Sequence, residues 1–369
     1  MKLKEICKIK HGFAFKGADI INDHVTKYIL VTPGNFNIGG GFKSDKCKYY
    51  SENAEIPQDY ILKENDLIIT MTDLSINSDT LGYSALIPFD NNNIYLHNQR
   101  IGLVYDIDET RVIKEYLYWF MRTNEYQQKV VASQSGTAIH HTSPDRILEI
   151  DIQLPSILEQ KKIVKILFDI ENKIKINDEI NDNLHEIIRC NYLYLISHNE
   201  LKEIELEEIA DVTTGKRPIN KLKSGEYPII GANGIMAYTS DYNFDEDLII
   251  TGRVGTLGVV KRYYNKIWAS DNALVIKTKY LNYIENYLNT IDYYSLNRGS
   301  TQPLLTQGDL KKQKVMFNEE MVSKFESENQ IYVDKIRNNE EENIKLSQLR
   351  NTLLPKLMNG EIDLDNIEI

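Results

Sequence analysis

The pattern of apolar and polar positions predicts short strands followed by a long helix, and it does so twice along the chain. Apolar, β-branched runs separated by Gly, Asn and Asp turns predict strands. These runs are Tyr28–Val31, Leu67–Thr70 and Ile101–Tyr105 in the first half, and Tyr227–Ile230, Leu248–Thr251 and Ala273–Ile276 in the second. Helical patterns over Glu115–Val131 and Tyr283–Tyr294 follow them. The pattern therefore predicts, for each half, a compact domain of mixed strands and helices that is followed by a long helix.

Each long helix carries a heptad seam, in which mostly apolar and Asn positions recur at alternating steps of four and three. The first seam is Ile163, Leu167, Ile170, Ile174, Asn177, Asn181, Leu184, Ile188, Asn191 and Leu195. The second is Phe325, Asn329, Tyr332, Ile336, Asn339, Asn343, Leu346, Arg350, Leu353 and Leu357. The alternative is two amphipathic helices that each pack on their own domain. However, a seam of roughly 40 residues extends about 60 Å, which favours pairing of the two helices.

The centre of each seam supplies the candidate helix-pairing residues. They are Ile174, Asn177, Asn181 and Leu184 on the first helix and Ile336, Asn339, Asn343 and Leu346 on the second. A buried Asn costs stability unless it is paired, but it fixes register and partner choice. At the helix ends, Ser156 and Glu159 have the spacing of a capping box, and Gly360 follows Pro355 as a predicted C-terminal cap.

The two halves share short motifs in the same order. Leu3-x-Glu5-Ile6 returns as Leu206-x-Glu208-Ile209, and Asp66–Thr70 returns letter for letter as Asp247–Thr251. The other matches are Gly136-Thr137 with Gly299-Ser300, Thr142 and Asp145 with Thr306 and Asp309, and Asn181-x-x-Leu184 with Asn343-x-x-Leu346. The offset falls steadily along the chain. One unit duplicated in tandem, with longer loops in the first copy, explains that order.

These observations predict an α+β fold: two mixed α/β domains in a pseudo-two-fold internal repeat, each followed by a long helix, with the two helices paired as a coiled coil. The expected segments are residues 1–155 for the first domain, 156–198 for the first helix, 199–318 for the second domain and 319–358 for the second helix. The C-terminal segment, 359–369, resembles the segment that leads from the first helix into the second domain. We therefore expect it to pack on the first domain and close the repeat.

The distribution of charge is uneven. The formal net charge is −11, and residues 319–369 alone hold 6 basic against 12 acidic residues. Residues 201–318 are close to neutral, with 15 basic against 14 acidic residues. Nucleic-acid binding is compatible with these numbers, but the chain lacks a strong positive surface of its own.

Several classes of protein and site are disfavoured. No apolar run approaches the roughly 18 residues needed to span a bilayer, and the first residues lack an apolar signal core, so a cytoplasmic location is expected. Cys7, Cys47 and Cys190 lie far apart, which argues against a disulfide framework or a zinc site. His140 and His141 are adjacent, and adjacent residues rarely bind one metal, so no metal is expected.

No catalytic set emerges, and the chain is not expected to be an enzyme. It lacks a phosphate-binding loop motif and the paired prolines typical of amino-methyltransferases. Pro144-Asp145 followed by Glu159-x-Lys161 fits a loose nuclease spacing. The second copy has no counterpart, however, and the capping box already accounts for Glu159.

Polar and charged turns at matching places in both copies are the candidates for reading DNA. Arg reads guanine, and Asn or Gln reads adenine, by paired hydrogen bonds to base edges. The first copy offers Asn98, Gln99, Arg100, Gln134, Ser135, Gly136, Thr137 and His140; the second offers Lys216, Arg217, Arg253, Lys261, Arg262, Arg298, Gly299, Ser300 and Gln302. For any one of these residues, a solvated turn is the competing interpretation. The glycine and hydroxyl shared by the Gly136 and Gly299 loops, between differing flanks, favour a common scaffold with separate specificities.

Over essentially its whole length, the chain resembles the DNA-specificity subunit of type I restriction–modification systems. The resemblance rests on the repeated Leu-x-Glu-Ile starts, Asp-Leu-Ile-Ile-Thr, the Gly136 and Gly299 loops, Leu154-Pro155 with Glu159–Ile163, and the ending Leu349–Ile362. One departure is Met316-Phe317-Asn318, where that family usually has Leu-Pro before the second helix.

The resemblance implies two target-recognition domains, separated by two long antiparallel coiled-coil helices, each domain reading one half of a split site in double-stranded DNA. It also implies partners: two methyltransferase subunits that supply S-adenosylmethionine and adenine methylation, and two restriction subunits where cleavage accompanies methylation. The chain itself would hold no cofactor. Two alternatives remain: a specificity subunit for a type II-like methyltransferase or nuclease, and a coiled-coil adaptor that binds only protein.

Overall fold

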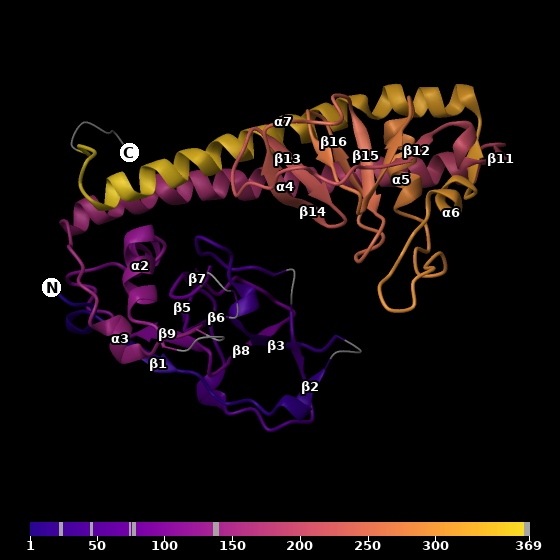
Figure 1. The fold of residues 1–369 in the computed structure, drawn as a ribbon. Coiled ribbons are helices and arrows are strands. Elements are labelled where there is room, and N and C mark those ends of the chain that lie inside the picture. Colours follow the sequence, from indigo (N-terminus) through magenta and orange to yellow (C-terminus); the bar gives the residue numbers. More distant parts are fainter. Residues whose placement is uncertain (22–24, 45–46, 74, 76–78, 136–139, 365–369) are drawn as a thin grey trace. The chain divides into compact units, whose positions relative to one another are not determined.

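The computed structural model describes residues 1–21, 25–44, 47–73, 75, 79–135 and 140–364 (Figure 1). The chain divides into two compact units. Unit 1 comprises Met1–Ile174 and Ile344–Ile369, and unit 2 comprises Lys175–Asn343. The two long helices each belong partly to unit 1 and partly to unit 2.

Unit 1 is built on two four-stranded sheets. The first has the order β1-β9-β5-β7 and is antiparallel throughout, while the second has the order β2-β4-β3-β8 with β3 and β8 parallel. A short pair, β6 and β10, lies beside them. The strands are β1 (Lys8–His11), β2 (Ile20–Ile21), β3 (Tyr28–Val31), β4 (Tyr49–Tyr50), β5 (Leu67–Thr70), β6 (Thr72–Asp73), β7 (Ser84–Leu86), β8 (Ile94–His97), β9 (Ile101–Tyr105) and β10 (His140–His141). The three strands predicted for this half are confirmed as β3, β5 and β9.

Three short α-helices cover the unit 1 core: α1 (Lys114–Phe120), α2 (Asn124–Ala132) and α3 (Pro144–Leu148). The prediction of one continuous helix over Glu115–Val131 is therefore wrong, because the structure has two helices, α1 and α2, in this range. Thr123 accepts a hydrogen bond from the amide of Tyr126 and so begins a new helix. The 3₁₀ helices of this unit are η1 (Leu3–Glu5), η2 (Gly17–Asp19), η3 (Pro33–Asn35) and η4 (Gln58–Tyr60).

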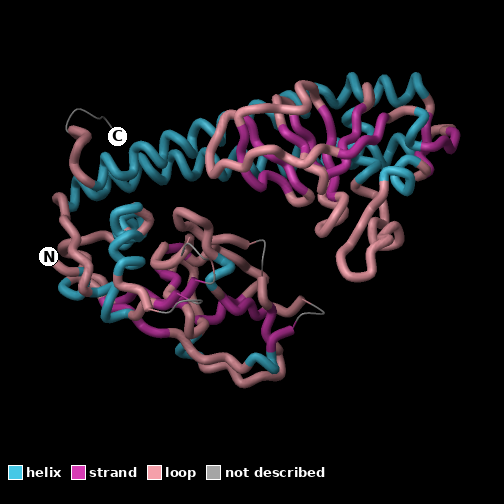
Figure 2. Tube along the Cα trace, viewed as in Figure 1, coloured by secondary structure: helices cyan, strands magenta, loops and turns pink. Residues whose placement is uncertain are grey.

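Unit 2 likewise has two sheets and a separate strand pair, and its strands are drawn in magenta in Figure 2. An antiparallel sheet has the order β12-β18-β15-β16, a second sheet has the order β14-β13-β17 with β13 and β17 parallel, and β11 pairs with β19. The strands are β11 (Lys202–Glu205), β12 (Asp211–Thr214), β13 (Tyr227–Gly231), β14 (Gly234–Thr239), β15 (Leu248–Gly252), β16 (Lys261–Tyr263), β17 (Trp268–Ala269), β18 (Ala273–Lys277) and β19 (Lys314–Phe317). The predicted strands of this half are confirmed within one residue as β13, β15 and β18.

The repeated Leu-x-Glu motifs have the same structural role in the two units. Each forms a 3₁₀ helix, η1 in unit 1 and η5 (Leu206–Glu208) in unit 2, and its leucine is fully buried. Unit 2 also has α5 (Leu281–Leu288) and α6 (Gln307–Lys311). Because α5 ends at Leu288, the helix predicted to reach Tyr294 extends six residues too far.

The long helices are α4 (Ile157–His198) and α7 (Glu319–Met358), of 42 and 40 residues. The capping box before α4 is confirmed, since Ser156 and Glu159 exchange backbone-to-side-chain hydrogen bonds at 2.8 and 3.3 Å. Pro355 lies inside the last turns of α7. Gly360 then ends the helix with a φ of 68°, as a C-terminal cap requires.

The two helices run antiparallel within each unit. In unit 2, Asn181 pairs with Asn339, and Asn191 pairs with Asn329. In unit 1, Ile163 and Leu167 of α4 share a core with Leu354 and Leu357 of α7. That core also contains Leu3 and Trp119, so the seam residues pack against the domain as well as against the partner helix.

The segment after α7 returns to unit 1. Leu364 belongs to the unit 1 core, and Ile362 packs against it. Lys162 of α4 donates a hydrogen bond to the carbonyl oxygen of Leu364 at 2.7 Å. Residues 365–369 lie outside the described part of the chain.

Candidate nucleic-acid interface

The two units present a loop of the same construction next to the end of their central sheet. In unit 1, the backbones of Ser135 and His141 exchange two hydrogen bonds of 2.9 Å, and the amide of Thr142 donates to the Met71 carbonyl. In unit 2, the amide of Arg298 donates to Leu304 O, and that of Leu305 donates to Arg253 O. Each loop is thus closed at its neck and attached to the chain that leaves the central strand.

The structure fixes the correspondence between these loops. A constant offset of 163 matches Ser135 with Arg298 and His141 with Leu304. The helix caps follow the same offset, because Ser143 caps α3 and Thr306 caps α6. The expected matches of Thr142 with Thr306 and of Asp145 with Asp309 are therefore displaced by one residue.

In unit 2, the side chain of Asn297 organises the loop from inside. Its Oδ1 accepts the amides of Gly299 and Leu304, both at 2.9 Å. A Cβ at Gly299 would lie 1.8 Å from the carbonyl oxygen of Gln302, so only glycine allows this closure. Ser300 and Gln302 are exposed at the tip.

Arg298 projects from the neck of this loop and forms a paired interaction with Asp309. Its Nη2 and Nε lie 2.8 and 3.2 Å from the two carboxylate oxygens. The bond from Arg298, together with that from the Thr306 hydroxyl, lowers the pKa of Asp309 to about 2. The guanidinium is 65% exposed, so its free edge stays available to a ligand.

Arg253 lies between this loop and a second turn. Its amide donates to Asn272 O and its Nη1 to Asp271 O at 3.0 Å, while the amide of Gly255 donates to Pro303 O. Lys216 joins the same neighbourhood, because its amide bonds Ala269 O and its carbonyl accepts from Trp268. The structure thus gathers Lys216, Arg217, Arg253, Arg298, Gly299, Ser300 and Gln302 on adjoining turns.

Lys261 and Arg262 lie apart from those turns, on strand β16 at the edge of the sheet. Lys261 is exposed, as a phosphate contact requires. The Arg262 side chain is only 5% exposed; it lies 3.3 Å from Glu285 and donates to Asn282 at 2.8 Å. The Arg262 side chain thus interacts within unit 2, and its burial disfavours the DNA contact predicted for it.

A buried carboxylate completes the surroundings of Arg262. Glu326 of α7 accepts the amides of Asn282 and Tyr283 at the start of α5, at 3.1 and 2.7 Å. Burial raises the pKa of Glu326 to about 7 despite these bonds and the nearby Arg262. Because Glu326 lies far from Arg262 in the sequence, no local pattern marked it.

In unit 1, the turn Asn98–Arg100 occupies the place of Ser270–Asn272. Gly12 approaches Asn98 so closely that a Cβ would lie 2.1 Å from its carbonyl oxygen, just as Gly215 approaches Ser270. Asn98 is buried and accepts the amide of Arg100 at 3.0 Å, which leaves the Gln99 and Arg100 side chains exposed. The carbonyl of Arg100 accepts the amide of Met71, which places this turn beside the neck of the loop.

The unit 1 loop itself is only partly described. Gln134 is half-buried, Ser135 is exposed, and His140 is half-buried on β10; Gly136 and Thr137 lie outside the described residues. His140 pairs with Asp73 across the β6–β10 ladder. Sequence reasoning missed Asp73, a buried carboxylate whose oxygens accept the amides of Ser75 and Thr80.

The geometry shows no assembled catalytic group in the candidate sets. Asp145 lies exposed on α3, while Glu159 is occupied by the capping box. Within the described ranges, no three His, Cys, Asp or Glu side chains converge as a metal-binding set. None of the helices in those ranges is long and apolar enough to cross a membrane.

Comparison with known proteins gives a consistent result. Residues 1–186 and 198–320 match the family model of the type I restriction modification DNA specificity domain. The chain is 24% identical over 311 residues to the MjaIX specificity subunit of a type I restriction enzyme from Methanocaldococcus jannaschii, which covers 71% of this chain and 72% of that protein. The MjaVIII specificity subunit of the same organism is 24% identical over 204 residues, covering 50% of this chain and 42% of that protein.

The fold is also similar to a solved structure. The S subunit of a type I restriction–modification system from M. genitalium superposes with a TM-score of 0.55 at 17% identity. The superposition covers 97% of this chain and 95% of that protein. Both are mixed α/β proteins with long helices.

Proposed function

We propose, on the premise that this chain belongs to the family of type I restriction–modification DNA specificity domains, that each of its two units reads one half of a bipartite DNA site. As a type I specificity subunit, the chain would direct methyltransferase subunits to that site. In this proposal it supplies recognition, while the partners supply S-adenosylmethionine and the chemistry of methyl transfer, and restriction subunits join for cleavage.

One observation carries the proposal: a shared loop frame presents different side chains in the two units. The neck hydrogen bonds match at a constant offset, but unit 1 has Gln134, Ser135 and His140 where unit 2 has Asn297, Arg298 and Pro303. Arg discriminates guanine, whereas Gln discriminates adenine. Equal frames with unequal side chains suit two separate readers better than one continuous surface.

The long helices support the second part of the proposal. We infer an antiparallel coiled coil that relates the two units by a pseudo-two-fold axis and sets the spacing between the half-sites. The Asn pairs between α4 and α7 in unit 2 fix one register for these helices. A fixed register gives a fixed separation, as recognition of a split site needs.

The test is to transplant the unit 2 loop, residues 297–304, from a specificity subunit with a different target. The full chain is assembled with its methyltransferase subunits, and methylated sites are mapped across a genome. We expect the methylated sites to show a new sequence in one half-site, while the other half-site and the spacer stay unchanged. Simultaneous change of both half-sites would refute independent reading, and an unchanged site would refute the role of this loop.

A further inference from the structure

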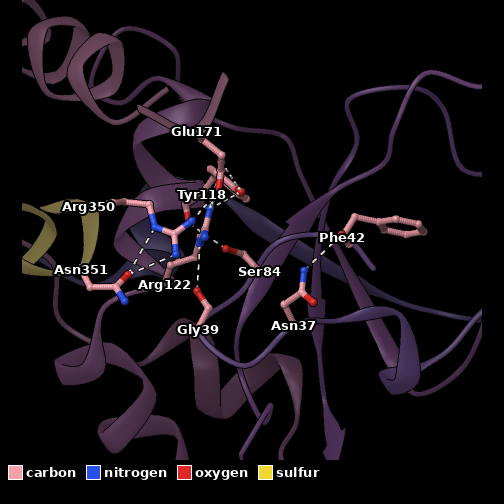
Figure 3. Close-up of polar contacts among 9 residues, drawn as sticks. All are labelled: Asn37, Gly39, Phe42, Ser84, Tyr118, Arg122, Glu171, Arg350 and Asn351. Carbon is pink, nitrogen blue, oxygen red and sulfur yellow. Dashed lines mark hydrogen bonds and ion pairs between the residues drawn. The ribbon is translucent and has the colours of Figure 1, made fainter. Parts of the chain in front are cut away.

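A single carboxylate in unit 1 joins the recognition domain to both long helices (Figure 3). Glu171 of α4 accepts hydrogen bonds from the Tyr118 hydroxyl at 3.1 Å, from Arg122 Nη1 at 2.9 Å and from Arg350 Nη1 at 3.3 Å. Tyr118 and Arg122 belong to the domain, at and just beyond α1, while Arg350 belongs to α7. Two guanidinium groups therefore share one carboxylate.

The domain builds an enclosed site for the Arg122 side chain. Its guanidinium carbon lies 4.3 Å from the ring centre of Trp119 and 4.8 Å from that of Tyr118. Its Nε donates to Gly39 O at 3.0 Å, and the side chain is only 3% exposed. Gly40 has a φ of +85°, and a Cβ there would lie 2.5 Å from Arg122 Cγ. A cation so completely enclosed depends on its carboxylate partner.

The two residues that take the places of Glu171 and Arg350 in unit 2 are apolar. The offset of 162 that matches Asn181 with Asn343 relates Glu171 to Val333, and Arg350 to Ile188. Val333 and Ile188 are 5% and 4% exposed and belong to one hydrophobic core. No basic residue follows α5 where Arg122 follows α1, since the chain continues as Asn289-Thr290-Ile291. The sites on α4 and α7 against which the two domains pack, here called seats, thus differ in chemistry: Glu171 and Arg350 at one, Val333 and Ile188 at the other.

We propose that Glu171 and Arg350 are positioning residues that mark one end of the helical pair as the seat of the first recognition domain, with Arg122 as the matching group. This inference rests on the proposed function, because it assumes that each domain reads its own half-site. At the Val333 seat, Arg122 would meet an apolar side chain in the position of its carboxylate partner. At the Glu171 seat, the second domain would leave the charges of α4 and α7 without their third partner.

The proposed consequence is a fixed order of the two half-sites along the DNA. An internal repeat with two interchangeable seats could dock either domain at either end. An ionic layer at one seat and an apolar layer at the other remove that ambiguity, because a mismatched domain leaves a buried charge unpaired. The network is therefore a device of specificity rather than of net stability.

The decisive experiment exchanges residues 1–155 and 199–318 within the full chain, assembled with its methyltransferase subunits. Methylation at the half-site of the transposed first domain is expected to fall by on the order of a hundredfold relative to the native order. Adding Val333→Glu and Ile188→Arg to this chimera should raise methylation at that half-site again by at least about tenfold. The same two substitutions in the native-order chain should instead impair the second half-site.

Two outcomes would overturn the proposal: full methylation by the unmodified chimera, or no recovery in the substituted chimera. Because a chimera can fail to fold, the native-order chain provides a second test. Glu171→Gln should broaden the distribution of spacer lengths among methylated sites, whereas Asp169→Asn, an exposed neighbour on α4, should not. A spacer distribution for Glu171→Gln identical to that of the wild type counts against the proposal. If moving a domain never changed the sequence or position of its half-site in any chimera, the proposed function itself would be wrong.

Discussion

Asn339 of α7 donates a hydrogen bond from its side-chain Nδ2 to Oδ1 of Asn181 on α4 at 2.8 Å. Both residues are buried, and among the described residues Oδ1 of Asn339 has no partner. The neighbouring amide pair joins Asn177 to Asn343 at 2.9 Å. This layer supplies directional contacts in a seam that is otherwise largely apolar, so register and stability can be tested separately.

Replacing one member of the pair should cost stability. Asn181→Leu leaves the Asn339 amide buried and unpaired, which is expected to lower the free energy of unfolding by about 1–3 kcal/mol. The double variant Asn181→Leu with Asn339→Leu should recover most of that loss while it weakens the choice of register. Urea unfolding of the three proteins measures the first effect, and Asn183→Leu, at an exposed site on α4, is the control. A single variant as stable as the wild type would show that the pair contributes little.

Arg253 and Lys261 separate base reading from phosphate contact. Arg253→Ala is expected to relax specificity at one base pair, at a cost of about 1–3 kcal/mol on the cognate duplex. Arg253→Lys keeps the charge but loses the paired donors, so it should relax specificity similarly. Binding of cognate and singly substituted duplexes by the assembled complex measures both effects.

Lys261→Ala serves as the contrast, because its side chain is exposed on an edge strand. It should weaken all duplexes alike and reduce the salt slope by about 0.9. If Arg253→Ala behaved in the same way as Lys261→Ala, Arg253 would be another phosphate contact.

His97 makes the stability of unit 1 depend on pH. It is fully buried, its Nε2 lies 2.8 Å from the Ile101 carbonyl oxygen, and burial lowers its pKa to about 4. Protonation therefore favours the unfolded chain. This contribution is fully present above the unfolded pKa of about 6.5 and is lost as the pH falls toward 4, to a total of about 3 kcal/mol.

The chain offers a clean way to measure this effect, since of its two tryptophans Trp119 lies in unit 1 and Trp268 in unit 2. In a Trp268→Phe background, Trp119 fluorescence follows unit 1 alone. The stability difference between His97 and His97→Gln proteins should grow as the pH rises from 4.5 to 6.5. Glu326 in unit 2, with its pKa raised to about 7, acts in the opposite direction, which is why the comparison is made on unit 1. A difference that does not vary with pH would show that His97 is not the titrating group.

Local apolar patterns were sufficient to predict six of the strands and the two long helices. A strand such as Leu67–Thr70 is buried on every side chain, and a short apolar run bounded by turn residues identifies it. The break between α1 and α2 was missed because the apolar period continues across it, and only the Thr123 cap reveals the new start.

The fate of charged side chains could not be predicted in the same way. Arg122 is separated by 49 residues from Glu171, and Arg262 by 20 from Asn282. Whether a cation faces solvent or a buried carboxylate depends on such pairings, which no local pattern contains. The Gly299 loop was easier to identify, because its glycine requirement is local and a glycine recurs at the matching place in the sequence of the other half.

The last prediction follows from how the chain uses its cations. Arg122, Arg262 and Arg298 each lie within about 3.3 Å of a carboxylate of the same chain, and the net charge is −11. Each phosphate neutralised by a free cation contributes about −0.9 to the salt slope. Phosphate contacts also orient a reader on the duplex, so a chain with a net charge of −11 should bind weakly by itself. We therefore expect the isolated chain to bind its target poorly, and the methyltransferase subunits to tighten binding and steepen the salt dependence. Titration of labelled duplex at two salt concentrations, with and without the partner, measures both. Tight, sequence-specific binding by the isolated chain at physiological salt would contradict the argument, because it would require more phosphate contacts than are expected of a chain with this excess of acidic residues.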